Sequence, residues 1–214
     1  MKIERMRWAI RFAALVLPMT CWPGALSAQL QGTARAVAFG VAVRTATVNQ
    51  TTPSAVLPSD GSLAQDQASD VLVASFVTAH DAFATATGAD DGTQSDAVSS
   101  ATLGVVNILN GLITADGVVA MASSTVGNSN AEGSSLANLV VNGVQIGDPA
   151  PNTRVDLPGT GYAVLNEQIP TTGGITVNMI HVVLQQPILD LFGGVTGYQT
   201  MGEIIVGSAT TGVN

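Results

Sequence analysis

Short apolar runs separated by turn-forming residues fill the C-terminal half of this chain, and this rhythm most restricts what it can fold into. Turn residues recur at 142–143 (Asn-Gly), 147–149 (Gly-Asp-Pro), 158–159 (Pro-Gly) and 171–174. Gly and Asn accept the positive φ of tight turns, and Pro presets a turn φ. Short strands at such close, regular spacing are typical of all-β folds. We expect one antiparallel β-sandwich or jelly-roll-like domain, with a barrel as the alternative.

The N-terminal half carries a strand signal followed by a loop signal. Residues 33–48 alternate apolar and small side chains, which predicts a half-buried strand. The side chains expected on its core face are Val37, Phe39, Val41 and Val43. Residues 51–62 contain two prolines and an Asp-Gly pair, which predict a loop.

The middle of the chain is less regular. Residues 70–87 place Leu72, Phe76 and Phe83 at helical spacing, but their β-branched content and two-residue alternation favour a strand. Asn110-Gly111 between apolar runs predicts a hairpin turn. Near the C-terminus, residues 187–194 suggest one helical turn, and residues 202–213 a last strand. Aromatic side chains are few, so we expect a core of Val, Ile, Leu and Ala.

Residues 1–28 have the three parts of a secretory signal peptide. Lys2 and three arginines precede the apolar run 12–17, and the small-residue segment 25–28 follows. The run is far shorter than the roughly 20 residues of a membrane-spanning helix. We expect cleavage after Ser27 or Ala28, loss of the only cysteine, Cys21, and a mature domain of residues 29–214. That domain would be secreted or lie at the cell surface, with the periplasm as the alternative.

Removing the signal peptide leaves a strongly acidic chain. Its cations are Arg35, Arg44 and Arg154, against fourteen of the fifteen carboxylates, so the formal net charge is 3 − 14 = −11. Such a surface repels phosphate backbones and anionic lipid head groups. We therefore expect neither a nucleic-acid partner nor electrostatic binding to membranes.

Four blocks of sequence resemble the choice-of-anchor P family: residues 111–124, 134–146, 150–168, and 175–184 with 202–209. The resemblance implies an exported bacterial surface or extracellular β domain, and it carries over no catalytic residues. Members of that family differ in their C-terminal sorting signals. Here only residues 210–214 follow the last block, so we expect release or non-covalent retention rather than covalent anchoring.

One acidic turn is the candidate metal site. Asp90, Asp91 and Asp96 surround a glycine, and Ca²⁺ prefers such oxygen ligands. The spacing is not that of an EF-hand, so a solvated turn without a cofactor is the favoured alternative. His80 and His181 lack a third histidine or a thiol to complete a metal site. We expect His181 to be a strand residue bonded to a neighbour.

No pattern of catalytic residues stands out. There is no Gly-x-Ser-x-Gly turn, and neither histidine lies in a triad context. We expect a non-enzymatic protein with a structural or adhesive role, acting through self-association or binding to extracellular matrix components. A ligand-binding module, calcium-dependent or specific for glycans, is the alternative, and an uncharacterised hydrolase the third reading. One form of self-association would insert residues 29–48 into a neighbour's sheet edge.

Overall fold

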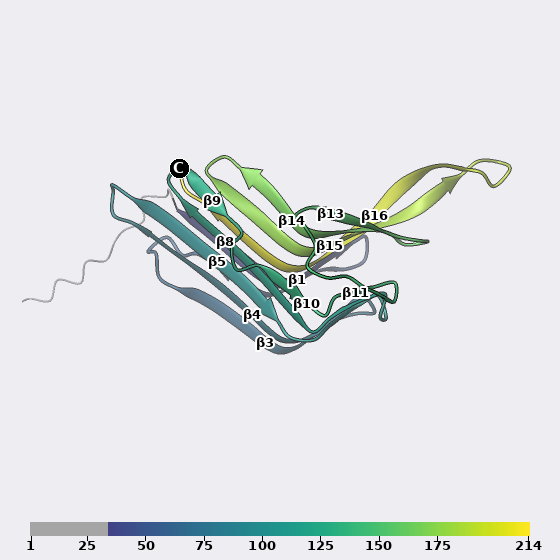
Figure 1. Ribbon diagram of the computed structural model, residues 1–214, viewed down its shortest axis with the longest axis horizontal. Helices are drawn as coiled ribbons and strands as arrows, with labels where there is room; N and C mark the ends of the chain where they lie inside the picture. Colours follow the sequence, from purple (N-terminus) through teal and green to yellow (C-terminus); the bar gives the residue numbers. More distant parts are fainter. Residues whose placement is uncertain (1–33) are drawn as a thin grey trace, which may run out of the picture.

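The computed structural model describes residues 34–214, and this part of the chain consists of antiparallel β-strands without a helix (Figure 1). The predicted signal peptide lies outside the described residues. The strands are β1 (Arg35–Thr45), β2 (Asn49–Val56), β3 (Ala64–Val73), β4 (Val77–Asp90), β5 (Ser95–Leu103), β6 (Val106–Ile108), β7 (Ile113–Ala115), β8 (Gly117–Thr125), β9 (Asn128–Asn130), β10 (Ser135–Ala137), β11 (Val140–Val141), β12 (Val144–Gln145), β13 (Thr153–Leu157), β14 (Gly161–Thr171), β15 (Gly174–Leu189) and β16 (Val195–Gly212).

The strands form two sheets that pack face to face, which confirms the predicted sandwich. Sheet A has the order β13-β14-β15-β16-β1-β2, and sheet B has the order β10-β8-β5-β4-β6-β7-β11-β12, with β3 on β4 and β9 on β8. β16 and β1, from the two ends of the described chain, pair centrally in sheet A and pack over β4, β5 and β8. Strand pairing in the middle of sheet A therefore joins the two ends of the described chain.

The core between the sheets is aliphatic, as expected from the composition. Val, Ile, Leu and Ala side chains supply nearly all of it, with Met179 added. Hydrogen bonds also cross it: the Ser99 hydroxyl donates to the Thr210 carbonyl at 3.1 Å, and the hydroxyls of Ser124 and Thr211 lie 2.7 Å apart. The polar groups inside this core are thus paired with one another.

In the central strands of sheet A, every second residue faces the core, and this alternation shifts by one position at one point. These points lie side by side and form a line across the sheet. It runs through Asn166, Met179, Gly207, Gly40 and Pro53, and we call it the fold line. Regular pairing stops at each of these residues and resumes beyond it in the same register. On β1, the core residues before the line are Ala36 and Ala38, and those after it are Val41 and Val43. Strict alternation would put these two pairs on opposite faces.

The fold line corrects the prediction for the first strand. Val41 and Val43 are buried as expected, but Val37 and Phe39 lie on the outer face and are only half-buried. Where two consecutive residues of a strand both face the core, the strand bends. The outward-facing residues on either side of that pair then tilt toward each other. Sheet A consequently curls along the line.

Gly207 shows why the line needs a special residue. Its φ is +68°, in the left-handed region that favours glycine. A Cβ at this position would lie 2.6 Å from Cγ1 of Val118 on β8, in the facing sheet. Both backbone conformation and packing therefore exclude a side chain here.

Two other sequence predictions are wrong. Of the segment predicted as a loop at 51–62, only residues 57–62 form one; residues 51–56 belong to β2, whose Pro53 is tolerated because β2 is the edge strand of sheet A. The helical turn predicted at 187–194 is instead the tip of a long hairpin, in which β15 continues to Leu189 and β16 starts at Val195. The paired ends of these strands, residues 185–200, project beyond the sandwich (Figure 1). We call this hairpin the arm.

Residues 70–87 are strand, as favoured, but a tight turn after Val73 divides them between β3 and β4. The hairpin predicted at Asn110-Gly111 is confirmed, with Ile108 opposite Ile113 and both turn residues at positive φ.

The proposed donation of residues 29–48 to a neighbour does not agree with the fold. Residues 35–45 form β1, which pairs with β16 on one side and with β2 on the other, within the same chain. Deleting this segment would remove a central strand and much of the core. In this structure, β1 therefore completes its own sheet rather than lying free for a neighbour's sheet edge.

Gly207→Ala should destabilise the protein by about 2 to 4 kcal/mol, from left-handed strain of about 1 to 2 kcal/mol and overpacking against Val118. Gly111→Ala is the matched control, since its φ of +89° imposes strain while nothing lies within 4 Å of the added Cβ. Urea unfolding of both variants measures the difference. Equal losses of unfolding free energy in the two variants would show that the contact with Val118 does not constrain the fold line.

Candidate functional site

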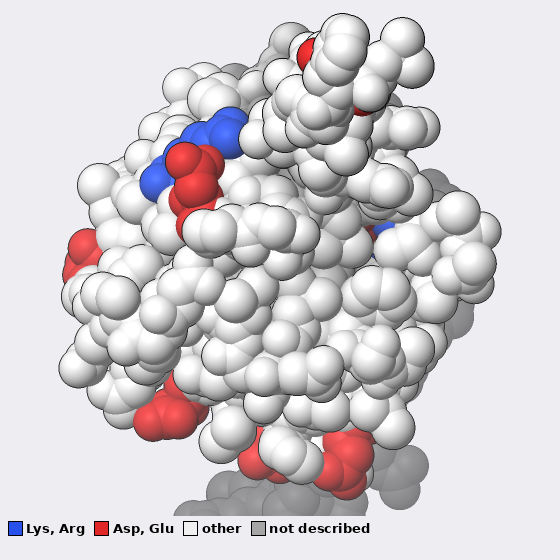
Figure 2. Space-filling view, turned by 90° about the vertical axis from the view of Figure 1, so that its right-hand side faces the viewer, with Lys and Arg blue, Asp and Glu red and all other residues white. Residues whose placement is uncertain are grey.

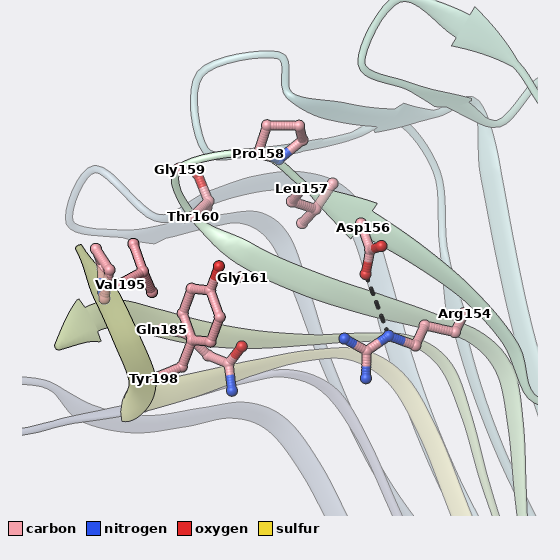
Figure 3. Close-up of a pocket in the computed structure, with 11 residues that line it drawn as sticks. Arg154, Asp156, Leu157, Pro158, Gly159, Thr160, Gly161, Gln185, Val195 and Tyr198 are labelled. Carbon is pink, nitrogen blue, oxygen red and sulfur yellow. Dashed lines mark hydrogen bonds and ion pairs between the residues drawn. The ribbon is translucent and has the colours of Figure 1, made fainter. Parts of the chain in front are cut away.

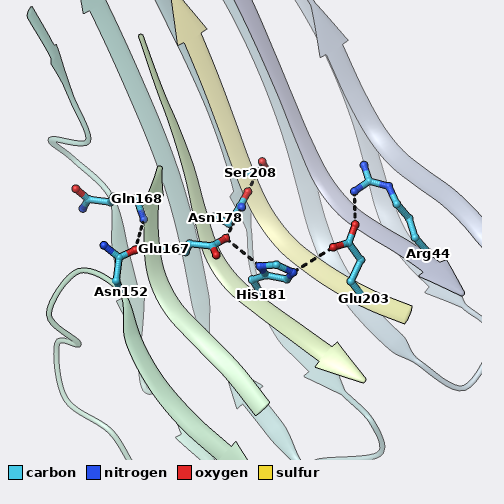
Figure 4. Close-up of polar contacts among 8 residues, drawn as sticks. All are labelled: Arg44, Asn152, Glu167, Gln168, Asn178, His181, Glu203 and Ser208. Atoms are coloured by element: carbon cyan, nitrogen blue, oxygen red, sulfur yellow. Dashed lines mark hydrogen bonds and ion pairs between the residues drawn. The ribbon is translucent and has the colours of Figure 1, made fainter. Parts of the chain in front are cut away.

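Polar side chains form a connected row on the outer face of sheet A (Figure 4). His181 on β15 is its centre: Nδ1 lies 2.9 Å from Oε2 of Glu167 on β14, and Nε2 lies 3.2 Å from Oε2 of Glu203 on β16. Glu203 also accepts a hydrogen bond of 2.6 Å from Arg44 on β1. The row thus joins four adjacent strands through alternating charges.

A second branch of the row runs along the fold line. Asn178 donates to Glu167 Oε2 at 2.7 Å, and the Ser208 hydroxyl donates to Oδ1 of Asn178, also at 2.7 Å. Asn178 and Ser208 are 5% and 2% exposed although they face outward. Glu167 and His181 belong to opposite sides of the fold line, with Glu167 paired to Asn178 and His181 paired to Val164. The curl of the sheet brings them together.

These contacts shift the pKa values of both groups. The hydrogen bond to Glu167 raises the pKa of His181 above its ordinary 6.5, although burial acts in the opposite direction. Burial tends to raise the pKa of Glu167, but hydrogen bonds from His181 and Asn178 outweigh it and bring the pKa below 4.5. A protonated His181 beside an ionised Glu167 is therefore favoured at mildly acidic pH.

A pocket lies between the arm and the turn from β13 to β14 (Figure 3). Its volume is about 430 Å³. Its apolar lining comes from Leu157, Pro158, Pro187, Val195 and Tyr198. Arg154 adds a positive charge, with Nε 3.2 Å from Oδ1 of Asp156 and the guanidinium 3.7 Å from the centre of the Tyr162 ring. The pocket thus has a mixed lining, in which the charge of Arg154 is paired with that of Asp156.

The structure does not bring the three candidate calcium ligands together. Asp90 points inward and is 7% exposed, whereas Asp96, opposite Ala89, points outward. The carboxylate of Asp91 is used within its own turn, where hydrogen bonds from the Thr93 hydroxyl and from the backbone of Gln94 and Thr93 lower its pKa to about 2. Among residues 34–214, no group of three His, Cys, Asp or Glu side chains is placed to hold a metal ion.

The two histidines lie in different sheets. His80 is on β4 of sheet B, where its Nδ1 lies 2.7 Å from Oδ1 of exposed Asp70, while His181 is on β15 of sheet A. Both contact carboxylates, and such a bond to a neighbour was expected only for His181. Sequence reasoning missed the remainder of the row and the pocket, because Glu167, Asn178 and Glu203 form no local motif and meet only through strand pairing.

No family model, curated protein or solved structure matches this chain. The resemblance to the choice-of-anchor P family therefore stays a prediction. Within the part of the chain that the structure describes, no helix has the length and hydropathy to cross a membrane.

Stability should be greatest between about pH 4.5 and 6.5. The pKa of His181 is raised by folding, so its contribution is complete below 6.5 and is lost as the pH rises through the folded value. The pKa of Glu167 is lowered, so its contribution is complete above 4.5 and is lost as the pH falls through the folded value. Glu167→Gln should weaken the loss of stability on both the acidic and the basic side of this window. Inside the window it should lower the free energy of unfolding by about 1 to 3 kcal/mol.

Urea unfolding from below pH 4.5 to above pH 6.5 checks the expectation. The control is His80→Gln, which breaks an exposed pair and should change stability by less than about 0.5 kcal/mol. A Glu167→Gln profile parallel to that of the wild type would show that the row does not control the pH dependence.

Calcium should not stabilise the mature protein, because Asp90 and Asp96 face opposite sides of their sheet. A ligand that binds only the native state must raise the melting temperature. Calorimetric titration and thermal unfolding, with calcium and with chelator, should therefore show no difference. A rise in melting temperature that Asp96→Asn abolishes would establish the calcium site instead.

Proposed function

We propose that this chain is an exported, non-enzymatic β-sandwich with a structural or adhesive role at the cell surface or in the extracellular matrix. The observation that carries the proposal is the arm. Its tip residues Leu191 and Phe192 are 99% and 96% exposed. Exposed apolar patches of this kind mark sites of interaction. A hairpin that buries no apolar tip in its own domain is suited to binding something outside it.

The polar groups of the site favour a structural role over a catalytic one. Both ring nitrogens of His181 face carboxylates, so the imidazole is engaged on both sides. A general base must have a nitrogen available for the proton that it takes. The row instead links β14, β15, β16 and β1 to one another across the bend through side-chain contacts.

Export is supported by the N-terminal sequence. The basic segment, apolar run and small-residue segment of residues 1–28 form a signal peptide pattern, and the resemblance to the choice-of-anchor P family agrees with a surface or extracellular location. The acidity of the mature chain adds solubility.

The pocket beside the arm supports a second candidate, a ligand-binding module. Its 430 Å³ volume falls within the usual range of small-molecule sites, and Tyr198 offers an aromatic face on which a sugar ring could stack. A glycan screen with Tyr198→Ala as the negative control tests this alternative.

Expression in a bacterial host followed by fractionation tests the main proposal. The wild-type chain should leave the cytoplasm, begin at Ala28 or Gln29 by mass spectrometry, and be retained by washed cells or their matrix. A variant with Leu191→Ser and Phe192→Ser should be exported equally but retained at least about tenfold less, because its tip loses the apolar surface.

Leu72→Ser is the matched control, since Leu72 is 68% exposed on β3, away from the arm. It should be retained like the wild type. Equal retention of the tip variant would remove the arm from the proposal, and a wild-type chain that stays in the cytoplasm with residues 1–28 attached would overturn the proposed location.

A further inference from the structure

The pocket between the arm and the turn from β13 to β14 holds polar side chains without a hydrogen-bond partner in residues 34–214 (Figure 3). Gln185 and Thr160 are half-buried in its lining, and the Gln185 N–H donates to the Thr160 carbonyl at 2.7 Å. This backbone bond fixes the positions from which both side chains start. The Gln185 amide and the hydroxyls of Thr160 and Tyr198, however, form no hydrogen bond with another residue of the described chain. They are therefore available to a ligand.

The two charged side chains of the lining neutralise each other. Arg154 and Asp156 lie two positions apart on β13, so both project from the same face of the strand. Nε of Arg154 is 3.2 Å from Oδ1 of Asp156, and the guanidinium also stacks on the ring of Tyr162. Within the described residues, the terminal nitrogens of Arg154 and the second carboxylate oxygen of Asp156 make no further hydrogen bond. The pair thus offers donors beside an acceptor, without a net charge.

This balance restricts the charge of the ligand. Figure 2, which looks onto the end of the molecule where the arm projects, shows a mostly uncharged surface on which the visible basic side chains lie next to acidic ones. An anion would be repelled by Asp156 and by the net charge of −11 predicted for the mature chain. A cation would have to displace Arg154 from Asp156, the only carboxylate among the described residues of the lining. A neutral ligand avoids both costs.

The lining also restricts the polarity of the ligand. Leu157, Pro158 and the ring of Tyr198 give the pocket an apolar part beside its polar groups. A wholly apolar ligand would cover those polar groups without replacing their hydrogen bonds to water, which is unfavourable. A sugar ring has a C–H face that stacks on aromatic rings, and its hydroxyls both donate and accept hydrogen bonds. The cavity of about 430 Å³ suits a short saccharide.

We propose that this pocket binds a short neutral oligosaccharide. One sugar ring stacks on Tyr198 and exchanges hydrogen bonds with Gln185 and Thr160. The adjoining unit places one hydroxyl as an acceptor from Arg154 and another as a donor to Asp156. The inference rests on the second candidate function, the ligand-binding module, and deepens it by naming the ligand class and its contacts.

Saturation-transfer NMR and titration of the mature chain with disaccharides test the ligand class. The neutral probes are cellobiose, maltose, lactose, mannobiose and N,N′-diacetylchitobiose. The charged probes are chitobiose, which is the cationic deacetylated form of the last, and the anion digalacturonate. At least one neutral probe should bind with a dissociation constant below about 10 mM, at least about tenfold more tightly than either charged probe. Failure of every neutral probe to bind in this range overturns the inference.

Substitutions in the pocket test the contacts, with the tightest neutral probe as ligand. Tyr198→Ala and Gln185→Ala should each raise the dissociation constant at least about fivefold, because a stacking surface or a hydrogen bond is lost. Neither change opens the core, since Tyr198 is 64% exposed and Gln185 is half-buried. Gln199→Ala is the matched control, since Gln199 adjoins Tyr198 on β16 but lies outside the lining. Equal dissociation constants in all three variants would contradict binding in this pocket.

Asp156→Asn tests the ion pair by a change of specificity. The variant leaves Arg154 unpaired, so its affinity for digalacturonate should rise at least about fivefold while its affinity for the neutral probe falls. An ion pair with a merely structural role would change neither affinity. An affinity for digalacturonate that does not rise would therefore contradict the proposed contact with the pair.

These measurements distinguish failure of the inference from failure of the functions proposed above. A charged disaccharide that binds most tightly, and whose binding Tyr198→Ala abolishes, would overturn the neutral class and leave the ligand-binding module standing. Absence of binding by any probe, with cell retention that depends on Leu191 and Phe192, would overturn the saccharide site and leave the adhesive role standing. Saccharide binding by a chain that cells do not retain would support the site and contradict the adhesive role.

Discussion

The bend of sheet A at the fold line is the constraint on which the other features of this structure depend. A regular strand must alternate its side chains between two faces. Four neighbouring strands break that rule in the same row, at Asn166, Met179, Gly207 and Gly40. Since each irregularity adjoins the next, the strands bend together and keep their register. The close approach of Gly207 to β8 makes the bend part of the core.

The polar row is a consequence of that bend. On a flat sheet, outward side chains on either side of Met179 would diverge, but here His181 contacts Glu167 across the line. The partly buried position strengthens these interactions, because the surroundings have a lower effective dielectric constant than water. Arg44 and Glu203 extend the row to β1, so the charged contacts join strands from both ends of the described chain.

The arm continues the same two strands that pass through the bend. Within the sandwich, β15 and β16 are enclosed by β14, β1 and the facing sheet. Beyond Leu184 the register shifts, and the two strands pair with each other and with no other strand of the described chain, although the Gln185 N–H still donates to the Thr160 carbonyl at 2.7 Å. One pair of strands therefore serves first as core and then as an exposed contact surface. The apolar residues of its tip do not contribute to the core, since Leu191 and Phe192 are almost fully exposed.

The sequence by itself determined the class of fold and most of its turns. Asn110-Gly111, Asn142-Gly143 and Pro158-Gly159 all lie in turns, because the φ angles that they accept are a local property of those residues. The aliphatic core also follows from composition. Tertiary structure alone decided which faces of β1 are buried, because the fold line depends on the neighbouring strands. It also decided that residues 187–194 extend a hairpin and that His181 meets Glu167 and Glu203. These are contacts between distant segments, and local patterns of hydrophobicity do not encode them.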